Sequence, residues 1–162
     1  MSLDRRFQSL SPAFLRAHPE VKEMVTQWPE ERIRGELDAV LETWNALDLT
    51  TAIAWRWYPK LRTSVGRAVF VDMMIELNPL LLARHPDQVR PVLVHEAAHL
   101  VVQRLHGSQN PHGRIWKHYM RQAGESTSAT HSLDVRGLRR KRASRPRRSK
   151  LPKLLRALRR RK

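Results

Sequence analysis

The first part of the chain consists of short amphipathic segments separated by prolines. Ser11 followed by Pro12 is typical of a helix start, because serine caps the first turn and proline fits its first position. We expect short helices at about 12–17 and 20–27, and a longer one at 29–46. The apolar face that predicts the longer helix consists of Ile33, Leu37, Val40, Leu41 and Trp44.

The middle of the chain changes to a pattern typical of β-strands. Residues 50–58 are rich in β-branched and aromatic residues and end before Pro59, which predicts a strand. Trp55 and Trp57 project from the same side of that strand. We expect them to pack between sheet and helix, and a platform for stacking nucleic-acid bases is the alternative.

A turn at 61–67 precedes two further predicted strands, at 68–71 and 73–77, and Asn78-Pro79 closes the second of them. Several short strands between helices are typical of an α+β domain. We therefore predict a small three-stranded sheet, antiparallel or mixed, packed on helices.

The second half of the chain is predicted to be helical. A short helix is expected at 80–84, the main helix at 87–105, a loop at 107–111 and a further helix from residue 112 or 113 to 123. Residues 125–132 are polar and are expected to be mobile. The buried stripe of the main helix is predicted to be Val89, Leu93, Ala97, Leu100 and Val101.

Composition narrows the class of protein. The chain has 162 residues and no cysteine, which fits one domain and excludes disulfides, thiolate metal sites and a cysteine nucleophile. We find no signal-peptide pattern and no run near the ~18 apolar residues of a membrane span. We therefore expect an intracellular protein, cytoplasmic or associated with the nucleoid or nucleus.

Charge is placed very unevenly. Residues 136–162 hold 15 of the 31 Lys and Arg and no Asp or Glu, so residues 1–135 hold 16 basic and 15 acidic residues, a net of +1. We expect this basic tail to be disordered when free and to bind nucleic-acid phosphates. The residues expected to contact nucleic acid are Arg139, Arg140, Lys141, Arg142, Arg145, Arg147, Arg148 and Lys150.

The last twelve residues, 151–162, add leucines at helical spacing to the basic pattern. They could form a basic amphipathic helix on an acidic surface, or dock back on the body of the protein. An anionic membrane is therefore the rival partner. We favour nucleic acid, because the preceding arginine run suits phosphate neutralisation without sequence readout.

The strongest chemical signal is His95-Glu96-Ala97-Ala98-His99, an H-E-x-x-H pattern on the main predicted helix. Residues i and i+4 lie on one helix face, so both imidazoles can reach a single Zn²⁺. Glu96 lies about 100° around the helix from His95. There it can act as a general base without being a ligand. The alternative is a buried helix with two satisfied histidines.

A catalytic zinc site usually has a third protein ligand. His106 is on the same helix, about 16 Å along the axis from His95, which is too far. Glu125 and His118 are candidates. We favour His112, because it follows a loop with glycine and proline that turns the chain back.

Four segments together resemble the SprT/Spartan group of zinc metalloproteases, which have minimal gluzincin-type domains. The resemblance covers roughly residues 30–124, with the segments in the family's order. It is carried by Leu61-Arg62-Thr63-Ser64-Val65-Gly66-Arg67-Ala68, Ile75-Glu76-Leu77-Asn78-Pro79, the H-E-x-x-H pattern, and His112-Gly113-Arg114-Ile115-Trp116-Lys117.

This resemblance implies a zincin-like metalloprotease fold with one Zn²⁺ bound by His95, His99 and His112, and Glu96 as the catalytic glutamate. The chain departs from many relatives in lacking the cysteine-based zinc ribbon, and the basic tail occupies that place. Oxyanion or substrate contacts are expected from residues that the sequence cannot rank: Arg67, His118 and Tyr119. For Arg67, a structural or DNA-binding role stays equally open.

The expected organisation is an N-terminal helical segment at 1–28, a metalloprotease domain at 29–124 and a basic tail at 125–162. We expect a zinc endopeptidase acting on proteins bound or crosslinked to single- or double-stranded DNA, a DNA-repair activity, with the tail as tether. The alternative is a zinc-stabilised module that binds DNA or ribosomal RNA without physiological proteolysis.

Overall fold

The computed structural model describes residues 10–128. The predictions for the basic tail, including the helix at 151–162 and the residues expected to contact nucleic acid, lie outside the described residues. Two short 3₁₀ segments, Leu47–Leu49 and Pro86–Gln88, accompany the helices and strands. In chain order the elements are α1 Pro12–Ala17, α2 Pro19–Gln27, α3 Glu30–Thr43, β1 Ala54–Trp57, β2 Gly66–Val69, β3 Met74–Leu77, α4 Pro79–Leu82, α5 Val89–His106 and α6 Arg114–Gln122.

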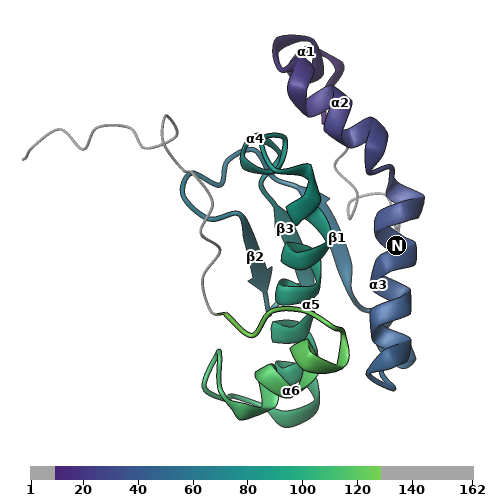
Figure 1. Ribbon diagram of the computed structural model, residues 1–162, viewed down its shortest axis with the longest axis vertical. Helices are drawn as coiled ribbons and strands as arrows, with labels where there is room; N and C mark the ends of the chain where they lie inside the picture. The colour runs from purple at the N-terminus through teal and green to yellow at the C-terminus, as the bar shows by residue number, and fades with distance from the viewer. Residues whose placement is uncertain (1–9, 129–162) are drawn as a thin grey trace, which may run out of the picture.

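The three strands form one mixed sheet in the order β1-β3-β2 (Figure 1). β1 runs parallel to β3, with Ala54 opposite Met74, and β2 runs antiparallel to β3, with Gly66 opposite Leu77. This confirms the predicted α+β class with a small three-stranded sheet. Because β3 is central, β2 is an edge strand whose outer side pairs with no other described strand.

Helix α5 is the centre of the domain and contacts β2, β3, α3 and α6 (Figure 1). The predicted stripe is buried, but burial extends around the helix from Val89 to Val102, and only the last turn is exposed. Sequence periodicity anticipated one buried face. The additional burial arises because α3, α6 and the sheet cover different sides of the same helix.

The predicted helices lie within three residues of their expected ends, whereas the strands are shorter or displaced. Residues 50–52 form a turn, in which Ala52 N–H donates to Leu49 O (3.0 Å), so β1 begins only at Ala54. The second strand lies at 66–69 rather than 68–71, because residues 70–73 are needed to reverse the chain into β3.

The two tryptophans of β1 are packing residues. Trp55 and Trp57 are 3% and 6% exposed, and their rings meet edge to face at 5.6 Å. This burial leaves no ring face for a nucleic-acid base, so the packing interpretation is the correct one. No described helix is both long and apolar enough to cross a lipid bilayer.

One buried side chain, Asn78, joins the loop after β1 to the start of α4. Its amide nitrogen donates to Leu61 O (2.9 Å) and Ser64 O (3.1 Å). Its carbonyl oxygen accepts from the backbone N–H groups of Leu80 (3.1 Å) and Leu81 (3.2 Å), which caps α4. Asn78 is fully buried, so all four bonds form away from water.

We expect Asn78→Asp to lower the free energy of unfolding by about 2–4 kcal/mol, because the carboxylate keeps the cap but loses both donors and faces two buried carbonyl oxygens. Urea denaturation of the full chain measures this. Asn45→Asp is the matched control, since Asn45 is exposed and has φ 51°, a conformation that Asp tolerates. Equal stability of the two variants would contradict the role given to Asn78.

Candidate metal centre

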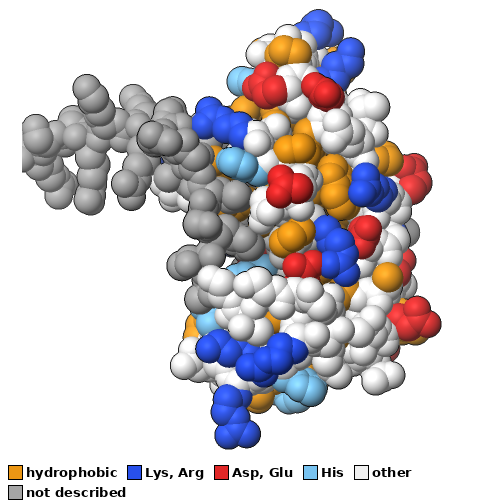
Figure 2. All heavy atoms as spheres, viewed as in Figure 1, with side chains coloured by type: hydrophobic (Ala, Val, Ile, Leu, Met, Phe, Trp, Pro, Cys, Tyr) orange, Lys and Arg blue, Asp and Glu red, His pale blue; other side chains and the backbone are white. Residues whose placement is uncertain are grey.

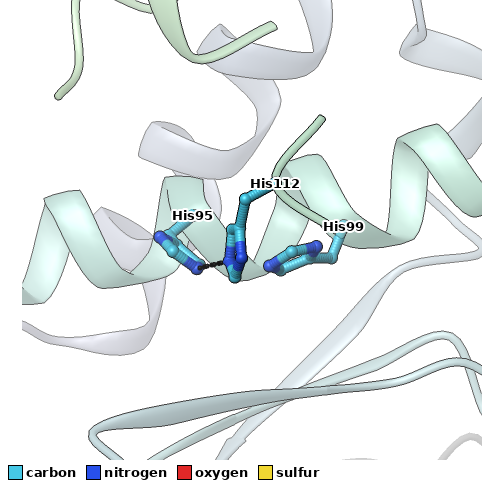
Figure 3. A group of neighbouring side chains, drawn as sticks. All are labelled: His95, His99 and His112. Carbon is cyan, nitrogen blue, oxygen red and sulfur yellow. Dashed lines mark hydrogen bonds between the residues drawn. The ribbon is translucent and has the colours of Figure 1, made fainter. Parts of the chain in front are cut away.

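Three histidines converge at the middle of α5 (Figure 3). His95 and His99 lie one turn apart on α5, and His112 comes from the loop that precedes α6. Their candidate ligand nitrogens all lie within 4.8 Å of one another. The Nε2 atoms of His95 and His112 are 3.3 Å apart. Two ligands of a tetrahedral ion with bonds of about 2.0–2.1 Å are separated by about the same distance, so the set fits a metal ion.

Trp116 of α6 forms a common wall behind the three imidazoles. Its ring centroid lies 4.8 Å from those of His95 and His112 and stacks at 5.6 Å on His99. The indole N–H also donates to the backbone oxygen of His95 at 3.4 Å. Because Trp116 is fully buried, it fixes α6 and the loop before it against the turn of α5 that carries the histidines.

The environment favours the neutral, metal-binding form of two of the histidines. Burial, together with the nearby His112, lowers the pKa of His99 to about 4. Burial and the charge of Lys117 also lower the pKa of His112. At neutral pH both imidazoles therefore offer a lone pair without first having to release a proton.

Glu96 lies in the same hollow as the histidines but outside the group that could bind the ion. Its side chain is 8% exposed. Burial raises the pKa of Glu96 to about 7, and a hydrogen bond from the backbone N–H of Ala68 opposes that rise. A carboxyl group with a pKa near neutrality can both accept and donate a proton at physiological pH.

The hollow that contains these groups, here called the histidine hollow, has a volume of about 560 Å³. Edge strand β2 and the loop before it form its second wall, opposite α5. Its lining residues are Thr63, Ser64, Val65, Gly66, Arg67, Ala68, Phe70, His95, Glu96, His99, Pro111 and His112.

Gly66 allows the close approach of β2 to α5. A Cβ atom at this position would lie 2.7 Å from Val92 Cγ1 and 2.9 Å from Glu96 Cγ. Gly66 and Ala68 belong to the family motif at 61–68, and the sequence alone gives neither of them an individual role. A glycine inside a strand pattern is the signal that could have identified the close contact.

Arg67 lines the histidine hollow, but its charged group is paired with Glu76. Successive side chains of a strand alternate between faces, so Arg67 lies opposite Gly66 and Ala68. Its Nε donates to Glu76 at 2.8 Å, and Arg56 Nε donates to the other carboxylate oxygen at 3.1 Å. Glu76 is 1% exposed, so the two guanidinium groups neutralise a buried charge. This arrangement supports the structural role.

The other candidates lie outside the histidine hollow. Tyr119 Oη is 2.9 Å from His106 Nε2, and with His118 these residues line a second hollow. Glu125 forms an ion pair with Arg90 of α5, and Arg90 Nε also donates to Glu36 at 2.9 Å. Of the three third-ligand candidates, Glu125, His118 and His112, the structure thus brings only His112 to His95 and His99.

The chain is similar in sequence to known proteins. The sequence model described as the SprT-like family matches residues 22–137. Protein SprT of Salmonella arizonae is 36% identical over 85 residues, which cover 51% of this chain and 52% of the relative. The SprT proteins of Escherichia coli K12 and Shigella boydii are each 35% identical to this chain, with the same coverage. The chain spans about half the length of these relatives, and no solved structure matches it.

We expect His112→Ala to weaken metal binding by at least about 10–100-fold, since a ligand contributes at least as much as an outer partner, whose loss costs that amount. Competition with a chromophoric chelator measures the affinity. His118→Ala is the control, because it removes a histidine of the second hollow and should leave the affinity unchanged. Equal losses for both variants would exclude the three-histidine site.

Gly66→Ala should lower the free energy of unfolding by about 1–3 kcal/mol, because the added methyl group overpacks the contact with Val92 and Glu96. Gly35→Ala is the matched control. A Cβ at Gly35, in helix α3, would meet nothing within 4 Å, so the variant should be about 0.5–1 kcal/mol more stable. Urea denaturation reports both, and a shift of the same sign would disprove the close approach.

Proposed function

This chain belongs to the SprT-like family, and on that basis we propose that it is a zinc-dependent endopeptidase that acts on DNA-associated proteins. The observation that carries the proposal is the position of Glu96. A purely structural metal site has no use for a buried carboxyl group in the same open hollow as its ligands. A peptidase needs such a group to move a proton between water and the leaving amine.

In this proposal His95, His99 and His112 hold the ion. When bound, Zn²⁺ supplies Lewis-acid polarisation of a peptide carbonyl and makes a water molecule more acidic. Glu96 accepts the proton of the attacking water at its carboxylate and passes it to the amine nitrogen of the broken peptide bond. The backbone N–H of Ala68 orients that carboxylate. The general base is therefore a residue of α5, and the group that orients it belongs to β2.

Strand β2 offers a way to hold an extended peptide in the histidine hollow. It is an edge strand and supplies one wall of that hollow. An extended chain can add to such an edge through backbone hydrogen bonds, which are independent of side-chain identity. This mode of binding suits a peptidase whose substrates share a location rather than a sequence.

The choice of DNA-associated proteins as substrates rests on charge and on the family resemblance. The 15 basic residues of 136–162, with no acidic residue among them, form a dense cationic segment. Such a segment binds DNA through phosphate neutralisation and raises the local concentration of proteins on the same DNA. Crosslinked DNA–protein adducts are the corresponding proposed repair substrate.

We expect Glu96→Gln to keep one zinc ion per chain but to lower the rate of histone cleavage on DNA by about 10²–10⁴-fold, the usual contribution of a general acid–base group. Metal analysis and gel-based cleavage with and without DNA measure the two properties. Glu23→Gln, at an exposed position of α2, is the control.

Undiminished cleavage by Glu96→Gln would disprove the assigned role. A wild-type protein that holds zinc and binds DNA but cleaves nothing would instead favour a zinc-stabilised nucleic-acid-binding module.

A further inference from the structure

A second hollow, of about 840 Å³, lies beside the histidine hollow. The loop 107–113 borders both, since Pro111 and His112 line the histidine hollow whereas Asn110 and Gly113 line the second one. The two hollows share no lining residue. The second, here called the basic hollow, is lined by His106, Gln109, Asn110, Gly113, Arg114, Ile115, Lys117, His118, Tyr119 and Arg121.

Helix α6 gives the basic hollow its charge. Lys117 and His118 lie three and four residues after Arg114, and Arg121 lies four and three residues after them, which places the set along one helix face. None of them forms an ion pair with a carboxylate of the described residues. No Asp or Glu occurs anywhere between residues 97 and 124. Figure 2 shows Lys, Arg and His side chains gathered at the end of the molecule where Figure 1 places α6.

The basic face is held in place by the buried side of the same helix. Trp44 of the α3 C-terminus donates its indole N–H to Tyr119 O at 2.9 Å, and its ring meets Tyr119 edge to face at 5.4 Å. Tyr119 in turn bonds His106 of α5. The cations therefore extend from a helix that is fixed at both neighbouring elements, so binding a ligand requires no ordering of the backbone that carries them.

We propose that the basic hollow binds the sugar-phosphate backbone of DNA. From Arg114 to Arg121 the cationic row is about 10 Å long. One DNA strand advances about 3.4 Å per phosphate, so the row matches roughly three phosphates. Gln109 and Asn110 add neutral amides of the kind that contact phosphates and sugars.

An acidic polypeptide is the rival ligand, and the charge of the whole chain favours DNA. The cationic segment 136–162 follows α6 in the sequence, and a long, uniformly charged polyanion can occupy both regions at once. The inference rests on the proposed function, because it names where the folded domain meets the same DNA. Bound there, the DNA would place an attached protein one loop away from Glu96.

The test is fluorescence anisotropy with a labelled single-stranded dT20 oligonucleotide, using the full zinc-loaded chain at a series of salt concentrations. The variant is Arg114→Gln with Arg121→Gln, two exposed positions. The matched control, Arg16→Gln with Lys22→Gln, removes the same charge from α1 and α2 at the other end of the molecule (Figure 1). Circular dichroism and zinc content verify that both variants are folded.

We expect the slope of log affinity against log salt to fall by about 1.4 for the Arg114/Arg121 variant, at about 0.7 for each lost single-strand phosphate contact. If variant and wild type have the same affinity at 1 M salt, this slope change makes the variant bind dT20 roughly 25-fold more weakly than the wild type at 0.1 M salt. The control variant should keep the wild-type slope, and binding of labelled poly-glutamate should weaken by less than twofold in the Arg114/Arg121 variant.

Equal slopes for the two variants would overturn the inference while leaving the proposed function intact. An equal loss of poly-glutamate binding would overturn it in favour of an acidic polypeptide ligand. No binding of dT20 by the wild-type chain would remove both the inference and the proposed DNA partner.

Discussion

The burial of helix α5 on several sides determines where every group of the candidate site lies. Each fully buried Val or Leu side chain stabilises the fold by roughly 1.5–3 kcal/mol, and α5 contributes several of them between Val89 and Val101. Rotation of the helix would disrupt its packing against the elements that cover it, so the directions of His95, Glu96 and His99 are fixed by this packing as well as by their own contacts. β2 and α6 then approach the same turn, the first through Gly66 and the second through Trp116.

Acidic and basic side chains of the domain concentrate on different helices. Acidic side chains concentrate on α3, where Glu36 helps to neutralise Arg90, whereas α6 carries cations without acidic neighbours in the sequence. A molecule with separated charges has an electrostatic dipole, which turns it as it approaches a polyanion. The end that carries α6 would face such a surface first, with the histidine hollow beside the point of contact.

Local signals in the sequence are sufficient to predict α5, the position of the H-E-x-x-H pattern on it and most helix ends, because prolines, glycines and helical spacing act within a few residues. The strand ends were not predictable in this way. The turn between β2 and β3 contains no glycine or asparagine, the residues that usually indicate a positive φ. Its last residue, Met73, nevertheless adopts a φ of 48°. The positions of Tyr119 and His118 depend on Trp44, 75 residues before Tyr119, so spacing on α6 could not separate them from the histidine hollow.

His112 lies on the loop before α6, whereas His95 and His99 lie on α5, so a bound ion would crosslink two parts of the chain. An ion bound by His99 and His112 would close a ring of chain that includes the last turns of α5 and residues 107–111 of the loop, much as a disulfide closes a loop. Such a crosslink lowers the conformational entropy of the unfolded chain, and the size of this effect depends only weakly on ring length. The same loop borders both hollows, so metal binding would make the wall between them more rigid. The local stability of this loop would therefore increase with the occupancy of the metal site.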